Sequence, residues 1–234
     1  MRDDLRRAHQ AILEHVASPG TWLTGAERVA VAQVSRAAPG CALCRERKAA
    51  LSPYAVGGEH DAAPGLDPLV VEVAHRVRTD SGRLSRAWFE ALRDAGLDDA
   101  RYVEVVGVVT MVAGLDYCAR ALGLDPFPLP RPRPGEPSRR RPASAKPAGA
   151  WLPTIAPEEA DGPEADLYGG VAFVPNIMRA LSLVPDQVRM LIMESDSHYV
   201  PIGRLTDPTA RRALDRAGME LVAARVSALN ECFY

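Results

Sequence analysis

The distribution of proline constrains this chain more than any other feature of its sequence. Eleven of its twenty prolines lie between Asp125 and Pro163, at alternate positions from Pro126 to Pro134. Proline interrupts helices and removes backbone donors, and a stretch with few large apolar residues cannot bury a core. We therefore predict an extended linker over 125–163 between two folded parts, residues 1–124 and 164–234. A partner-docking arm is the alternative, supported by the PxP repeats and by the run Arg139–Arg141.

Both folded parts have apolar residues at helical spacing, and neither alternates apolar and polar residues between turn signals. The sequence thus predicts an all-α fold of two helical repeats. Thr24 and Glu27 form a capping-box pattern at one helix start, and Gly96 and Gly123 are suited to helix C-termini. In the first part we expect helices over residues 5–17, 24–38, 69–77, 84–95 and 100–122, and a loop over 52–68.

The second part repeats the order found in the first, a long helix followed by a break and a cysteine. We expect one helix from Val174 through Met193. Thr206 or Asp207 should cap the next helix, with Pro208 in its first turn and an end near residue 228. Asn230 is suited to cap a further helix, in which Cys232 would lie.

Composition and charge exclude several classes of function. The net charge of -2 gives no electrostatic reason to expect a nucleic-acid partner or an anionic membrane surface. The N-terminus shows no secretory signal, and the longest apolar run, Val105–Leu115, is about half of the ~20 residues that a membrane span needs. We therefore expect a cytoplasmic protein without a membrane partner. In that compartment a CxxC motif is typical of redox or metal chemistry.

The CxxC motif, Cys41 and Cys44, follows the helix-breaking pair at residues 39 and 40. Cysteines three residues apart share one face of a helix, and Cys41 would lie at the helix start, where the helix dipole lowers a thiol pKa. Arg45, Arg47 and Lys48 add positive charge that favours the thiolate. We expect a reactive Cys41 and a resolving Cys44, able to form a disulfide. Two inert buried cysteines are the alternative.

A metal site at these cysteines requires two further ligands. The candidates in the first part are Glu59, His60, Asp61 and His75, but none has the paired spacing of a zinc module. A single histidine on an apolar helix, such as His75, is more typical of a core residue. The sequence therefore predicts neither a metal nor a cofactor.

Glu220 is the candidate proton carrier of the second part. It lies in the middle of the expected helix, fourteen residues beyond Thr206, so capping does not explain it. It precedes Cys232 by twelve residues, and a break at Asn230 would fold the two together. A glutamate in apolar surroundings has a raised pKa and is able to relay protons to a thiolate. The alternative is a solvent-facing glutamate on an amphipathic helix.

The segment MELVAARVSALNECFY, with Glu220 and Cys232, resembles the signature of the carboxymuconolactone decarboxylase / alkyl hydroperoxidase D-like superfamily. The resemblance covers residues 174–234, and more loosely 23–124 as a diverged copy. It implies an all-α fold, homo-oligomers and reduction of hydroperoxides through a cysteine pair that a thiol reductant or a redox partner protein regenerates. The catalytic residues it implies are Cys41, Cys44, Glu220 and Cys232.

The chain departs from that signature at defined positions. Four residues beyond Cys44, where the family has histidine, the chain has Lys48, and the second copy ends at Tyr234, before the second cysteine and the histidine. Glu27 lies fourteen residues before Cys41, and its place in the capping box explains it without catalysis. The expected function is that of a thiol-dependent peroxidase. The alternative is a catalytically degenerate helical protein retained for oligomerisation or partner binding.

Overall fold

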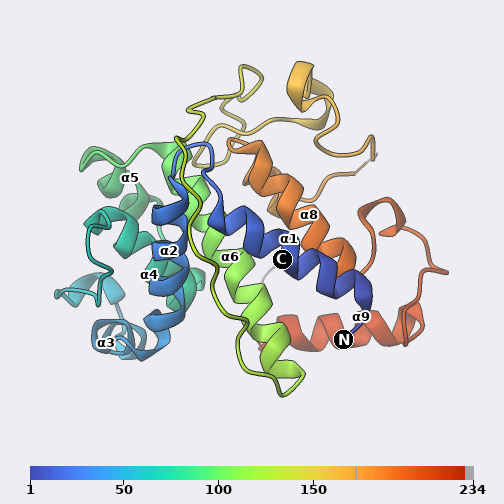
Figure 1. Ribbon diagram of the computed structural model, residues 1–234, viewed down its shortest axis with the longest axis horizontal. Coiled ribbons are helices and arrows are strands. Elements are labelled where there is room, and N and C mark those ends of the chain that lie inside the picture. Colours follow the sequence, from blue (N-terminus) through green and yellow to red (C-terminus); the bar gives the residue numbers. More distant parts are fainter. Residues whose placement is uncertain (172, 230–234) are drawn as a thin grey trace.

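Helix α6 (Asp99–Ala121) runs through the centre of the molecule in the computed structural model, with α2 (Gly25–Ala37) and α4 (Pro68–Asp80) packed on one side and α8 (Pro185–His198) on another (Figure 1). Its sequence is apolar on every face, which is typical of a buried helix. By length and composition α6 is able to span a membrane, but 61% of its most apolar window is buried inside the protein. A core helix of this kind passes the same test.

The structure describes residues 1–171 and 173–229. Within these ranges it is helical and contains no strand, only an isolated bridge between Lys146 and Thr154, so the predicted all-α fold is confirmed. The remaining helices, in chain order, are α1 (Asp3–Ala17), α3 (Ala42–Ala49), α5 (Arg86–Asp94), α7 (Asn176–Arg179) and α9 (Arg216–Leu229).

Local sequence signals set several of these helix ends. The side chain of Thr24 accepts from the backbone N–H of Glu27, and the Glu27 carboxylate accepts from the backbone N–H of Thr24, so the predicted capping box is present. Gly96 and Gly123 follow α5 and α6 with φ of 105° and 68°. Glycine adopts this left-handed conformation without a Cβ clash, which ends both helices as the sequence predicted.

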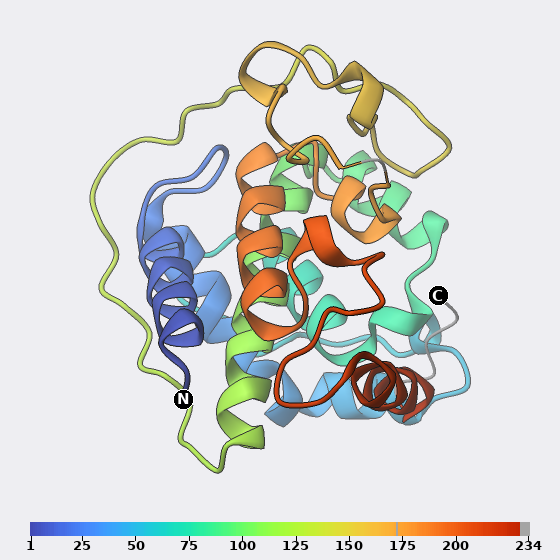
Figure 2. The ribbon, with the colours of Figure 1, turned by 90° about the vertical axis from the view of Figure 1, so that its right-hand side faces the viewer.

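The proline-rich segment after α6 lies along the surface in an extended path, drawn in yellow-green in Figure 2. Backbone hydrogen bonds tie it to the end of α1 and to the loop that follows, at 2.7 Å from Arg133 N to Ala17 O and 3.1 Å from Ser138 N to Gly20 O. Arg141 adds an ion pair to Asp99 at 2.7 Å. These contacts hold the proline-rich segment against the body of the protein.

The two helical parts share one hydrophobic core. The largest buried cluster contains Val16 and Val105 from the first part and Leu183 and Val188 from the second. Ile155, inside the proline-rich segment, is fully buried in the same cluster. Helix α8 packs against both α1 and α6, so its apolar face completes the core of the first part instead of forming a separate one.

The single helix expected over residues 174–193 is wrong in the structure, which has α7, a turn and then α8. Pro185 begins α8, and the preceding Val184 has φ -125° and ψ 84°, outside the helical region. The proline ring disfavours helical geometry in the residue before it, which explains the break. The Ser182 hydroxyl then accepts the Ile155 backbone N–H at 2.8 Å and joins the turn to the proline-rich segment.

The helix start expected at Thr206 or Asp207 is also wrong, because α9 begins at Arg216. The Asp207 carboxylate accepts from Thr209 within a turn and pairs with Arg204, which stabilises a local loop. Asp215 is the residue that accepts the Gly218 backbone N–H at the start of α9. One face of α9 is apolar and exposed, formed by Leu221, Val222, Val226 and Leu229.

Candidate functional site

Cys41 and Cys44 lie at the start of α3, as the sequence predicted. A short 3-10 turn at Ala38–Gly40 places Cys41 at the N-cap position, and Cys44 follows one turn later. Both are free thiols, 1% and 4% exposed. Burial alone would raise the pKa of Cys41, but hydrogen bonds from the backbone of Asp61 and Cys44 and from His60 outweigh it and lower the pKa to about 7.

His60 reaches the cysteines from the loop before α4. Its Nδ1 lies 3.5 Å from the Sγ of Cys41 and 3.5 Å from the Sγ of Cys44. Its Nε2 donates to the Glu72 carboxylate at 2.9 Å, which turns Nδ1 toward the sulfurs. Burial alone would lower the pKa of His60, but its contacts with Cys44, Glu72 and Cys41 raise it to about 10.

His75 approaches the same thiols from α4 and is fully buried. Its Nδ1 lies 3.1 Å from the Sγ of Cys44, and its Nε2 donates to the backbone carbonyl of Asp61 at 2.8 Å. The ring stacks on His60 with the centroids 4.1 Å apart. Burial lowers the pKa of His75, which favours the neutral ring, and the contact of Nε2 with the Asp61 carbonyl leaves Nδ1 to face the Cys44 thiol.

Glu72 supports this arrangement from the preceding turn of α4. Besides His60 it accepts from the guanidinium of Arg47 at 2.9 Å and from the indole N–H of Trp88 on α5 at 3.0 Å. Burial would raise the pKa of Glu72, but these three donors lower it to about 2. A charged carboxylate therefore fixes the orientation of His60.

The four donor atoms of Cys41, Cys44, His60 and His75 all lie within 4.8 Å of one another. A tetrahedral zinc ion, with bonds of ~2.3 Å to sulfur and ~2.0 Å to nitrogen, places its ligand atoms roughly 3.3–3.8 Å apart. The observed sulfur–nitrogen distances of 3.1 and 3.5 Å fit that tetrahedron. The spacing along the chain had counted against a metal, but the fold brings two thiols and two imidazoles together.

Other candidates from the sequence lie outside this group. Glu59 is exposed, and Asp61 contributes its backbone carbonyl instead of its carboxylate. Glu220 on α9 accepts from the Tyr199 hydroxyl and pairs with Arg216 at 2.7 Å, neither of which belongs to the cysteine cluster. Cys232 and Asn230 lie outside the described residues, so the expected pairing of Glu220 with Cys232 stays a prediction.

Glu72 is the residue that the sequence analysis did not single out. It lies three residues before His75 within the apolar stretch VVEVAHRV, where a lone glutamate has no capping role. A Glu-x-x-His pair on one helix face, following a CxxC motif, was the available signal.

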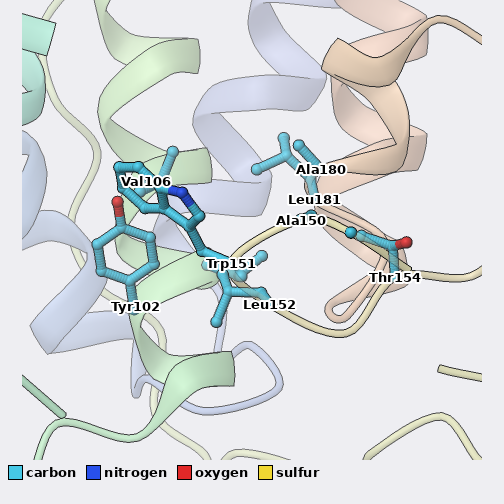
Figure 3. A pocket seen from close by; sticks show the side chains of 10 residues that line it. Tyr102, Val106, Ala150, Trp151, Leu152, Thr154, Ala180 and Leu181 are labelled. Carbon is cyan, nitrogen blue, oxygen red and sulfur yellow. The ribbon is translucent and has the colours of Figure 1, made fainter. Parts of the chain in front are cut away.

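A separate apolar cavity of about 380 Å³ opens between α6, residues 149–154 and the turn after α7 (Figure 3). Tyr102, Val106, Trp151 and Leu181 are among the side chains that line it. Among the described residues that line it, the Tyr102 hydroxyl is the one ionisable group, and burial raises that pKa to about 12. The cavity therefore supplies apolar contact surface and no acid–base group that titrates near neutral pH.

Comparison of the chain with protein-family models, with curated proteins and with solved structures finds no match.

Proposed function

We propose that Cys41, Cys44, His60 and His75 bind one zinc ion in a structural Cys2His2 centre. The observation that carries the proposal is the orientation of the two imidazoles. Each turns Nδ1 toward the thiols and anchors Nε2 on an acceptor, Glu72 for His60 and Asp61 for His75. Zinc-ligating histidines are held in this way by second partners in proteins.

The donor set and its burial favour a structural role. Two sulfurs and two nitrogens suit zinc, and four protein ligands leave no position for water or substrate. The ion would connect α3 with the loop before α4 and with α4 itself. Helix α3 has only eight residues, too few to be stable without tertiary contacts. Metal binding supplies folding free energy to such an element.

Metal content of the purified chain tests this proposal. We expect one tightly bound zinc per chain at the cluster, cobalt substitution with thiolate-to-metal charge-transfer absorption, and a lower thermal midpoint after chelation. Cys44→Ser and His75→Asn should each abolish binding of this zinc ion. Arg45→Gln, on the exposed face of α3, is the matched control and should retain it. Reduced protein that binds no zinc at micromolar concentration would overturn the proposal.

A thiol-dependent hydroperoxidase related to the alkyl hydroperoxidase D-like superfamily is the second candidate. The contacts of His60 with both thiols and with Glu72 favour it, because they supply the proton carrier that the signature position at Lys48 lacks. The Cys41 thiolate would attack a hydroperoxide oxygen, and the departing alkoxide would take a proton from His60 and leave as an alcohol. Cys44 would displace water from the Cys41 sulfenic acid to form a disulfide, which a dithiol reductant returns to two thiols.

Zinc loading separates the two candidates, because zinc occupies the thiols that the peroxidase needs. For the hydroperoxidase we expect hydroperoxide consumption by metal-free, reduced protein, a Cys41–Cys44 disulfide afterwards, and loss of both on adding zinc. For the structural centre we expect no consumption beyond that of Cys41→Ser in either form. Consumption that persists in Cys41→Ser would exclude this pair as the peroxidatic site.

A further inference from the structure

A second group of potential metal ligands lies where α1, α6 and α8 meet. His9 on α1, Cys118 on α6 and His198 on α8 place their ligand atoms within 4.8 Å of one another. His9 is 2% exposed, and its Nε2 lies 2.7 Å from the Nε2 of His198. The three residues are far apart in sequence, so only the packing of these helices brings them together.

A buried carboxylate accompanies this group. Glu194 lies one turn before His198 on α8 and is 6% exposed. It packs over Gly114, one turn before Cys118 on α6, where a Cβ would lie 2.0 Å from the Glu194 Oε1. The glycine thus makes room for the Glu194 side chain beside the turn of α6 that leads to Cys118.

The carboxylate beside the cluster has a buried oxygen that no hydrogen bond uses. Among the described residues, Oε1 of Glu194 has no hydrogen-bond partner. Buried polar atoms without partners are rare in folded proteins and require an explanation. A hydrogen bond between two neutral imidazoles accounts for the contact of His9 with His198. It does not explain why the Cys118 thiol and the Glu194 side chain lie beside them.

We propose that His9, Cys118 and His198 bind a second divalent transition-metal ion of the zinc class. Two nitrogens and one sulfur suit zinc and cobalt, and three protein ligands leave a fourth position for water. The side chain of Glu194, one turn before His198, would be the neighbouring hydrogen-bond partner of that water. In a tetrahedral site the two nitrogens lie ~3.3 Å apart, so the rings separate by about 0.6 Å on binding.

Metal at this site would clamp the N-terminal helix α1 to α6 and α8. The site shares no ligand with the proposed Cys2His2 centre, so a negative result for one site does not contradict the other. The three-ligand set also resembles an exchangeable or catalytic zinc site more than a closed structural one.

Titration of the metal-free chain with cobalt and then zinc tests the second site. We expect the native chain to bind two equivalents of metal. Cys118→Ser and His198→Asn should each bind one, at the Cys2His2 centre, and Cys44→Ser should bind one, at the second site. His15→Gln is the matched control and should retain two equivalents of metal. His15 also lies on α1 and contacts α8, through Gln187, but belongs to neither cluster.

Alkylation of Cys118, read by peptide mass, provides a measurement that requires no variant. Cys118 is half-buried, and zinc at the proposed site should slow its alkylation at least tenfold in the native chain and in Cys44→Ser. His198→Asn should lose this protection if its far-ultraviolet circular dichroism shows a native fold. If it fails to fold, protection in Cys44→Ser decides the question. A rate for Cys118 unchanged by zinc in Cys44→Ser would overturn the proposal.

Discussion

The imidazole of His60 and the carboxylate of Glu72 are joined by a 2.9 Å hydrogen bond that spans twelve residues of sequence. This bond fixes which ring nitrogen of His60 faces the thiols of Cys41 and Cys44. Glu72 therefore controls the proposed site without touching either sulfur. The same carboxylate contacts Arg47 and Trp88, so α3, α4 and α5 are held together through one side chain.

Glu72→Gln should weaken zinc binding at the Cys2His2 centre by roughly 10–100-fold, the usual effect of losing a partner of a metal-bound histidine. Glutamine keeps the size of the side chain but loses the charge that orients His60. Competition with a chromogenic zinc chelator measures the change. Glu59→Gln, an exposed carboxylate next to His60, is the control and should leave the affinity unchanged. Equal affinities in the Glu72 variant and the native chain would show that this hydrogen bond does not support a metal ligand.

Gly25→Ala should destabilise the chain by about 1–3 kcal/mol. A Cβ on Gly25 would lie 2.2 Å from the backbone oxygen of Ala17 and 2.7 Å from that of Arg133, where the proline-rich segment crosses the start of α2. Backbone atoms cannot move aside as a flexible side chain does. Urea unfolding measures the cost. The control is Gly82→Ala, which has open space around its Cβ and should unfold within about 0.5 kcal/mol of the native chain. Equal losses of unfolding free energy in the two variants would contradict the close approach of Ala17 and Arg133 to Gly25.

Glu104→Ala should cost about 3–5 kcal/mol, because it leaves the Arg28 guanidinium buried without its ion partner. The two side chains are 0% and 1% exposed and pair at 2.6 Å. The double variant Arg28→Met/Glu104→Leu removes both charges and should be more stable than Glu104→Ala alone. Chemical denaturation of the three chains measures this order. A double variant less stable than the single one would mean that other contacts of Arg28, such as that to the His15 carbonyl, carry the energy.

Glu194→Gln should stabilise the metal-free chain increasingly as pH rises. Burial raises the pKa of Glu194 from 4.5 to about 8. Between these values the unfolded chain releases a proton that the folded chain retains, so native stability is fully present below pH 4.5 and falls as pH rises toward 8. Glutamine does not titrate, and its advantage should reach at most about 4 kcal/mol at pH 8.

Unfolding at pH 5 and pH 8 in the presence of a chelator measures this difference. Glu158→Gln, at an exposed glutamate, is the control and should show no such trend. A constant difference between Glu194→Gln and the native chain at the two pH values would contradict a buried, protonated Glu194.

Local sequence determined most of the helical framework. The capping box of Thr24 and Glu27, the glycines at 96 and 123, and the break before Cys41 each act through residues within one or two turns, so their effect is readable without tertiary contacts. The apolar stripes likewise predicted which helices form a core. The start of the last helix was predicted at Thr206 or Asp207 and was wrong, because the helix begins at Arg216, where the Asp215 carboxylate accepts the Gly218 backbone N–H.

Tertiary structure decided which residues join Cys41 and Cys44 and which residues form the second cluster. The loop before α4 carries His60 back onto α3, and only that chain path brings His60 and His75 to Cys41 and Cys44, across a sequence spacing that resembles no zinc module. The meeting of His9 with His198 depends on α8 filling the groove beside α1 and α6. Helix formation depends mainly on neighbouring residues along the chain. The residues that meet as metal ligands depend instead on which helices bury their apolar faces against each other.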